Sequence, residues 1–139
     1  MYGALDISTS GMIAQRTRLT AISANIANKN SVMADGTPYR ARHVMFAAGD
    51  PAASSKDGRG WGVHVQQIQV DNAPFNLRWD PGDPRALKSG PHAGYVEESN
   101  VNPIMEQINA MEASRSYEAN AVAAEATKSM IGQALRLLA

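Results

Sequence analysis

The 139-residue sequence contains no cysteine, which excludes disulfide bonds and metal sites built on thiolates. It has no excess charge, since 13 basic residues balance 13 acidic ones, and this argues against nucleic acid or an anionic membrane as the main partner. No apolar run approaches the ~20 residues of a membrane-spanning helix. The first residues lack the basic and apolar regions of a secretory signal. We therefore expect neither direct membrane insertion nor a cleaved signal peptide.

Large apolar side chains are also few. Alanine accounts for 23 residues, whereas leucine, isoleucine, valine and phenylalanine together supply 25. Alanine buries little area, and burial stabilises a fold by roughly 25 cal/mol per Å² of apolar surface. The supply is therefore small for a self-contained core, which favours a chain that completes its packing against neighbours.

Patterns typical of catalysis and of metal binding are missing as well. His43, His64 and His92 fall in separate segments, without a second ligand three or four residues away. The glycine-rich residues 58–62 precede a candidate strand, whereas a phosphate cradle needs a helix after it. No nucleophile-elbow or paired-acid pattern is present. We expect no enzymatic activity, no metal and no cofactor.

Both ends of the chain show sevenfold apolar spacing, which is typical of helices that pack in pairs. One helix is predicted from about residue 6, capped by Asp6 or Ser8, to Asn28. A second is predicted from Pro103 to the end, with Asn102 as its N-cap, and its roughly 36 residues would span about 54 Å. The residues predicted at an assembly interface are Leu5, Met12, Leu19, Ile22, Asn25, Ile26 and Asn28 in the first helix, and Ala110, Tyr117, Asn120, Ala124, Ile131, Leu135 and Leu138 in the second.

If the two helices run antiparallel, their sevenfold positions can be aligned residue by residue. The favoured alignment places a large side chain opposite an apolar partner at each level, as interdigitating helices prefer. The same contacts could form within one chain or between two chains, and both remain open. The aligned pairs are Leu5 with Leu138, Met12 with Ile131, Leu19 with Ala124, and Ile26 with Tyr117.

The middle of the chain changes character, because it holds most of the glycine and all but one of the prolines, gathered in turn-forming clusters. Between these clusters, short strands are predicted at 39–46, 61–70, 75–79 and 94–96. Within the second, the apolar alternation shifts phase between Val65 and Ile68.

The organisation that follows is an α+β fold. Long terminal helices, in segments 1–32 and 101–139, are expected to form an antiparallel hairpin resembling a coiled coil. A small β-rich insert at 33–100 lies between them, with a mobile loop expected at 48–60.

Two asparagines, Asn25 and Asn28, lie beside the apolar side of the first helix, although asparagine is a poor residue for a helix interior. One explanation is that their amides are buried, bonded by neighbouring helices, and fix the helix register. The other is that the helix ends there and asparagine caps it. We favour buried amides, and the capping alternative stays open chiefly for Asn28.

Two segments carry distinctive motifs. The first, ALDISTSGMIAQRTRLTAISANIANKN, closes on the Asn-Ile-Ala-Asn motif at 25–28, and the second contains Ser-Arg-Ser-Tyr-Glu-Ala-Asn at 114–120. In both respects the chain resembles the flagellar rod, hook and hook-associated axial proteins. Its length is similar to that of the proximal rod subunits, since the distal rod and hook proteins are much longer.

The resemblance implies a non-enzymatic structural subunit of the flagellar basal body, exported by the flagellar type III apparatus without cleavage. Such a subunit would polymerise through its terminal helices into the drive shaft that transmits torque across the periplasm. It would contact copies of itself, other rod proteins and the adaptor between the rod and the MS ring. From the residues alone, the alternative is a soluble helical-hairpin adaptor whose β insert recognises a partner.

Overall fold

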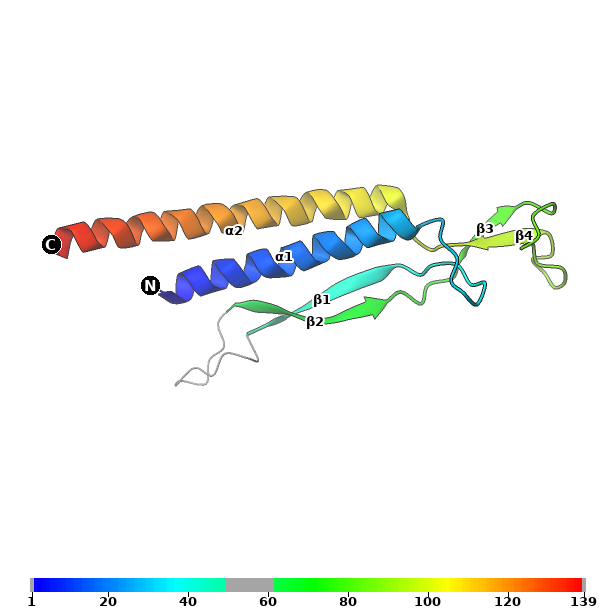
Figure 1. Ribbon diagram of the computed structural model, residues 1–139, viewed down its shortest axis with the longest axis horizontal. Helices are drawn as coiled ribbons and strands as arrows, with labels where there is room; N and C mark the ends of the chain where they lie inside the picture. Colours follow the sequence, from blue (N-terminus) through cyan, green and yellow to red (C-terminus); the bar gives the residue numbers. More distant parts are fainter. Residues whose placement is uncertain (1, 50–61, 139) are drawn as a thin grey trace.

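The computed structural model describes residues 2–49 and 62–138. Two long helices, α1 (Tyr2–Asn28) and α2 (Pro103–Leu138), lie side by side and run antiparallel, and the strands come between them in the sequence (Figure 1). This confirms the α+β class. Most of the loop predicted at 48–60 lies outside the described residues. The first residue of the strand predicted at 61–70 also lies outside them.

Helix α1 begins earlier than predicted. It starts at Tyr2, and the hydroxyl of Ser8 donates to the carbonyl of Ala4 over 3.2 Å, a bond between successive turns inside the helix. Neither Asp6 nor Ser8 is therefore a cap, and that prediction is wrong. The error arose because glycine and the apolar residues before position 6 carry no helix-start signal, while Ser8 does.

Helix α2 begins at Pro103, as the sequence predicts. The side-chain oxygen of Asn102 accepts hydrogen bonds from the backbone N–H groups of Ile104 and Met105, at 3.1 and 3.4 Å. Pro103 occupies the first helical position, where its missing N–H has no intrahelical partner to lose. The 36 residues of α2 match the predicted length.

Strands β1 (Arg42–Ala48) and β2 (Val63–Val70) form an antiparallel ribbon along α1. Their register shifts by one residue, because Met45 pairs with Gln67 whereas Phe46 pairs with Val65. The intervening Gln66 is the extra residue of a β-bulge. This bulge is the physical origin of the phase shift seen in the sequence between Val65 and Ile68.

Strands β3 (Asn76–Trp79) and β4 (Tyr95–Glu98) form a second antiparallel pair, at the end of the molecule far from both chain termini (Figure 1). Gly94 precedes β4 with φ of 86°, a left-handed conformation that favours glycine. A side chain there would also collide with the Trp79 ring, since a Cβ atom would lie 2.6 Å from it. Trp79 therefore packs across Gly94 and meets Tyr95 edge to face, with ring centroids 4.9 Å apart.

The contacts between the helices define their register. A Cβ atom placed on Gly11 would lie 2.8 Å from the side-chain oxygen of Asn120, so the two backbones approach closely at that level. Farther along, the half-buried Arg18 and the exposed Glu112 form an ion pair of 3.7 Å. Three contacts therefore mark equal levels along the pair: Gly11 with Asn120, Arg18 with Glu112, and Asn25 with Glu106.

Within the chain, the predicted register is wrong. Because Gly11 faces Asn120, Met12 lies level with about Ala119, which is about twelve residues, or roughly 18 Å, from Ile131. The other three predicted pairs are displaced equally. Alanine-rich helices offer many registers of similar apolar contact, and here a polar contact and a glycine decide between them. The shift also carries the last turns of α2 beyond the start of α1 (Figure 1). The same pairs between two chains stay a prediction.

The close approach at Gly11 leads to a testable comparison. Gly132, in the overhanging part of α2, has nothing within 4 Å of an added Cβ, so Gly132→Ala should stabilise the chain by up to about 1 kcal/mol through helix propensity. Gly11→Ala gains the same propensity but must displace Asn120 from its 2.8 Å bond to the Ser116 carbonyl, worth about 1 kcal/mol, and from its packing. We expect the free energies of unfolding of the two variants, from urea denaturation, to differ by about 1–2 kcal/mol in favour of Gly132→Ala. Equal stabilisation by both would contradict this register.

Candidate assembly surface

The side chain of Asn25 is the best-bonded polar group at the junction of the helices and the insert. It is fully buried, and its amide nitrogen donates to the Arg42 carbonyl over 2.9 Å and to the Glu106 carboxylate over 3.1 Å. Its amide oxygen accepts from the Arg42 backbone N–H over 2.9 Å and from the Tyr39 hydroxyl over 3.1 Å. We call these four residues the Asn25 cluster. It joins α1, β1, α2 and the segment before β1.

The Asn25 cluster shows which of the two explanations, a buried amide or a helix cap, applies to Asn25. A buried, hydrogen-bonded amide is confirmed for Asn25. Three of its four bonds, however, go to the β-rich insert, and only the bond to Glu106 goes to a neighbouring helix. Because all four bonds go to residues of its own chain, Asn25 stabilises the subunit itself.

Asn28 behaves differently. It is half-buried, and its amide nitrogen donates to the carbonyl of Ala24, four residues earlier, over 2.8 Å. Its side-chain oxygen accepts from the hydroxyl of Ser31 over 3.3 Å, and the Ser31 backbone N–H donates to the Asn28 carbonyl over 2.9 Å. These local bonds favour the capping alternative within the subunit, and burial of the Asn28 amide against neighbouring chains stays a prediction.

Asn100 and Arg40 hold the segment after β2. The side chain of Asn100 accepts from the Ala41 backbone N–H over 2.8 Å and donates to the Asp71 carbonyl over 3.2 Å. Arg40 donates to the Ala73 carbonyl over 2.9 Å and lies over the Phe75 ring, 4.1 Å from its centroid. These bonds tie the insert to the base of the helix pair.

The buried core is small and lies at the same junction. Its apolar cluster consists of Tyr39, Ala41 and Val101. Glu106, in the first turn of α2, is also buried there. A buried carboxylate needs a hydrogen-bond donor, and Asn25 supplies one. No local sequence pattern pairs residues 81 positions apart, which is why this partnership was missed.

One face of α2 carries large apolar side chains that the subunit does not cover. At 100° per residue, these side chains fall within a stripe about 100° wide. The fully buried Ala113 lies on the opposite side of the helix, toward α1. Ile104 is 69% exposed, Val122 65% and Leu137 88%. We call this surface the outer stripe of α2; its residues are Ile104, Ile108, Met111, Val122, Met130 and Leu137.

The residues predicted for an assembly interface are distributed around the helix pair. Ile22 and Asn25 are buried within the subunit. The side chain of Leu138 lies outside the described part, although α2 reaches this residue. As contacts between chains, all of these positions stay predictions. The exposed ones are Ile26, Tyr117 and Leu135, and the half-buried ones are Leu5, Met12, Leu19, Asn28, Ala110, Asn120, Ala124 and Ile131.

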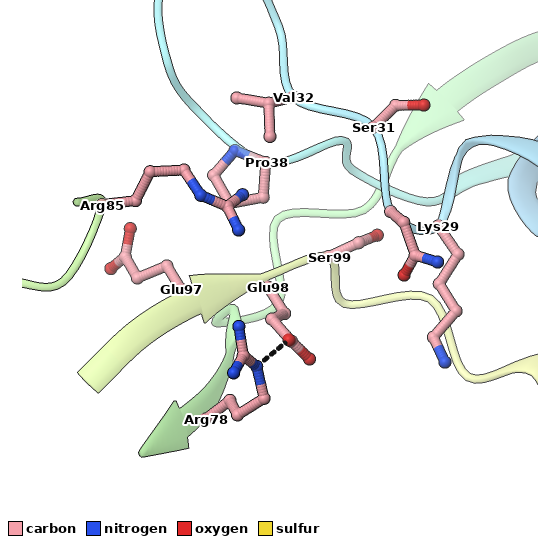
Figure 2. A pocket seen from close by; sticks show the side chains of 10 residues that line it. Lys29, Ser31, Val32, Pro38, Arg78, Arg85, Glu97, Glu98 and Ser99 are labelled. Carbon is pink, nitrogen blue, oxygen red and sulfur yellow. Dashed lines mark hydrogen bonds and ion pairs between the residues drawn. The ribbon is translucent and has the colours of Figure 1, made fainter. Parts of the chain in front are cut away.

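A polar cleft of about 310 Å³ lies between the segment after α1 and the β3–β4 pair (Figure 2). Arg78 donates to Glu98 and to Asp80, both over 2.6 Å, and these two carboxylates, Asp80 foremost, raise the pKa of Arg78. Lys29 and Glu97 also line the cleft. Small-molecule sites are mostly apolar, whereas charged side chains line much of this cleft. The bond between Arg78 on β3 and Glu98 on β4 links the two strands at the cleft.

The three histidines lie apart, as the sequence suggests. His43 is 3.4 Å from a carboxylate oxygen of Asp71, and His64 is 2.6 Å from the Gly49 carbonyl. The pKa of Asp71 lies below the ordinary aspartate value of 3.8, chiefly because the Ala73 backbone N–H donates to it and secondarily because of His43. Residues 2–49 and 62–138 contain no group of three acidic or histidine side chains that could hold a metal. In the same residues, no helix combines the length and the apolar character that crossing a membrane requires.

Comparisons with known proteins agree with this architecture. The family model "Flagella basal body rod protein" matches residues 5–32, within α1 and the turn after it, and "Flagellar basal body rod FlgEFG protein C-terminal" matches residues 92–137, which include most of α2.

Several curated relatives carry the name flagellar basal-body rod protein FlgC, and three of them are compared with this chain. The one from Borreliella burgdorferi is 37% identical, and the alignment covers 99% of this chain and 97% of the relative. The one from Bacillus subtilis is 35% identical over 98% and 97%, and the one from Salmonella typhimurium is 40% identical over 95% and 93%. Since this similarity runs through both helices and the insert between them, the chain belongs to the family of flagellar basal-body rod proteins FlgC.

Proposed function

We propose that the chain, a structural subunit of the flagellar basal-body rod, polymerises through its terminal helices into the proximal part of that rod. The observation that carries this proposal is the outer stripe of α2. Large exposed apolar side chains gathered on one face of a helix favour an interaction site, because they gain free energy only when a partner covers them. Because the chain belongs to a family of rod proteins, we favour this function over the alternative of a soluble adaptor whose β insert recognises a partner.

In the proposed assembly, α1 and α2 form a hairpin that packs like a coiled coil, and its outer surfaces contact the helices of neighbouring subunits. Leu5, Met12, Leu19 and Ile26 recur every seventh residue along one flank of α1, half-buried or exposed, and would be covered together with the outer stripe. The segments 1–32 and 101–139 then build the shaft, and the insert at 33–100 braces it. A shaft built in this way transmits torque across the periplasm.

The proposed partners are further copies of this chain, the other rod proteins and the adaptor between the rod and the MS ring. Delivery would use the flagellar type III export apparatus without cleavage of a signal peptide. The balanced charge supports partners other than nucleic acid, because a surface without excess positive charge gains little from phosphate groups.

The test is a strain that lacks the gene and is complemented with an epitope-tagged copy. We expect the deletion to abolish motility, and the tagged chain to restore it and to be found in purified basal bodies by immunogold labelling. The same strain carrying an empty vector is the control. A motile deletion strain, or a tagged chain that restores motility but is absent from basal bodies, would contradict the proposed function.

A further inference from the structure

Each of the four strands has one outer edge, because the described sheets are both two-stranded. Two of these edges are bonded at one residue each within the subunit, and each carries a charged residue, Arg42 on β1 and Glu97 on β4. The Asn25 amide binds both the N–H and the carbonyl of Arg42 on the outer edge of β1, as a neighbouring strand would. On the outer edge of β4, the Leu87 backbone N–H donates to the Tyr95 carbonyl over 2.9 Å.

The second half of β2 has an open outer edge. The Asp71 backbone N–H donates to the Ala41 carbonyl over 2.8 Å, toward β1. By the alternation of an antiparallel ladder, the backbone groups of Val70 and Ile68 therefore point away from β1. Their N–H and carbonyl groups have no hydrogen-bond partner within residues 2–49 and 62–138. At the other end of the strand, the Val63 N–H is bonded by the Ser10 hydroxyl over 3.1 Å.

Strand β3 also has an open outer edge. The Asp80 backbone N–H donates to the Gly94 carbonyl over 3.1 Å, toward β4. The backbone groups of Trp79 and Leu77 therefore point away from β4, and in the described part of the chain they have no partner. Trp79 is 61% exposed and Leu77 42%.

Protein chains protect exposed strand edges with charged residues or proline, because open edges pair with other strands. β2 contains neither, and its side chains at the open edge are exposed as well, Ile68 by 52% and Val70 by 44%. An edge of this kind is suited to accept a strand from another chain.

We propose that the outer edge of β2 in one subunit pairs with the outer edge of β3 in the next copy of this chain. This inference rests on the proposed function. A polar filament requires contacts between two different surfaces, whereas pairing of two identical edges would close a two-fold dimer. Because charged residues protect the outer edges of β1 and β4, the combination of different edges that remains is β2 with β3. On each of these two strands, the residues whose backbone groups point to the open edge lie two positions apart. Pairing of the edges would set Ile68 and Val70 against Leu77 and Trp79.

Because the chain has no cysteine, introduced cysteines give an unambiguous cross-link. Ile68→Cys would be made in one copy, and Leu77→Cys or Trp79→Cys in a second copy produced in the same cells, and purified basal bodies would be oxidised. We expect a disulfide between position 68 and position 77 or 79, identified by mass spectrometry, in at least one combination. Gln69→Cys is the matched control, because its side chain lies on the opposite face of β2, and it should cross-link at least tenfold less.

Two results would overturn the inference while leaving the proposed function intact. These are a disulfide joining two copies at position 68, which indicates two-fold pairing, and basal bodies that contain both variants without any cross-link between them. Absence of the unsubstituted chain from basal bodies would overturn both this inference and the function on which it rests.

Discussion

Asn25→Asp should lower the free energy of unfolding of the free chain by about 3–5 kcal/mol, the cost of leaving a buried charge without a partner. The substitution removes both N–H donors, which leaves the Arg42 carbonyl and the Glu106 carboxylate unbonded. It also places a second carboxylate about 3 Å from the first, inside a fully buried site. Urea denaturation followed by circular dichroism measures the loss.

The pH dependence of this loss has a definite sign. Burial beside another carboxylate raises the pKa of the introduced carboxyl group, so proton binding favours the folded state. Protonation of the introduced carboxyl group recovers stability, and this gain is complete below ~3.9, the pKa of the group in the unfolded chain. The gain is lost as the pH rises through the higher pKa that the group has in the folded chain. The variant should therefore differ most from the wild-type chain at neutral pH and less in acid.

Two further variants make the result specific to the Asn25 cluster. Asn30→Asp introduces the same change at an exposed position just beyond α1 and should alter stability by less than about 0.5 kcal/mol. Adding Glu106→Gln to Asn25→Asp reverses donor and acceptor, and should recover at least about 1 kcal/mol. Equal losses for Asn25→Asp and Asn30→Asp would show that the cluster contributes little to stability.

Val122→Asp should abolish rod assembly and motility while leaving the free chain folded. Val122 is 65% exposed in the subunit, so its replacement should change the free energy of unfolding by about 0.5 kcal/mol or less. In the assembly, the same side chain would bury an unpaired carboxylate at a helix contact, which costs several kcal/mol. Motility on soft agar and immunoblots of purified basal bodies measure the effect.

The matched control is Gln107→Glu, which adds one negative charge to the same helix at an exposed position about 90° around from the centre of the outer stripe. It should leave motility intact. A motile Val122→Asp strain would show that the outer stripe faces solvent in the rod. A large loss of stability in the free chain would show that Val122 belongs to the core of the subunit.

The sequence by itself determined the features that depend on neighbouring residues. Asn102 and Pro103 set the start of α2, because an N-cap and a fixed φ act within one helical turn. The phase shift between Val65 and Ile68 marked the bulge, since one extra residue reverses the side-chain alternation of a strand. The motifs at the two ends also indicated the family that the comparisons confirm.

Only the tertiary structure decided how these elements fit together. The sevenfold spacing of α1 and α2 allows several registers of similar apolar contact, since alanine contributes little area at any of them. In the observed register, Glu106 accepts a hydrogen bond from Asn25, and the missing side chain of Gly11 leaves room for the side chain of Asn120. An unbonded buried carboxylate costs more free energy than a shifted alanine contact recovers. The partners of Asn25 are Tyr39, Arg42 and Glu106, which lie 14, 17 and 81 residues away in the sequence, so folding is what brings them within bonding distance.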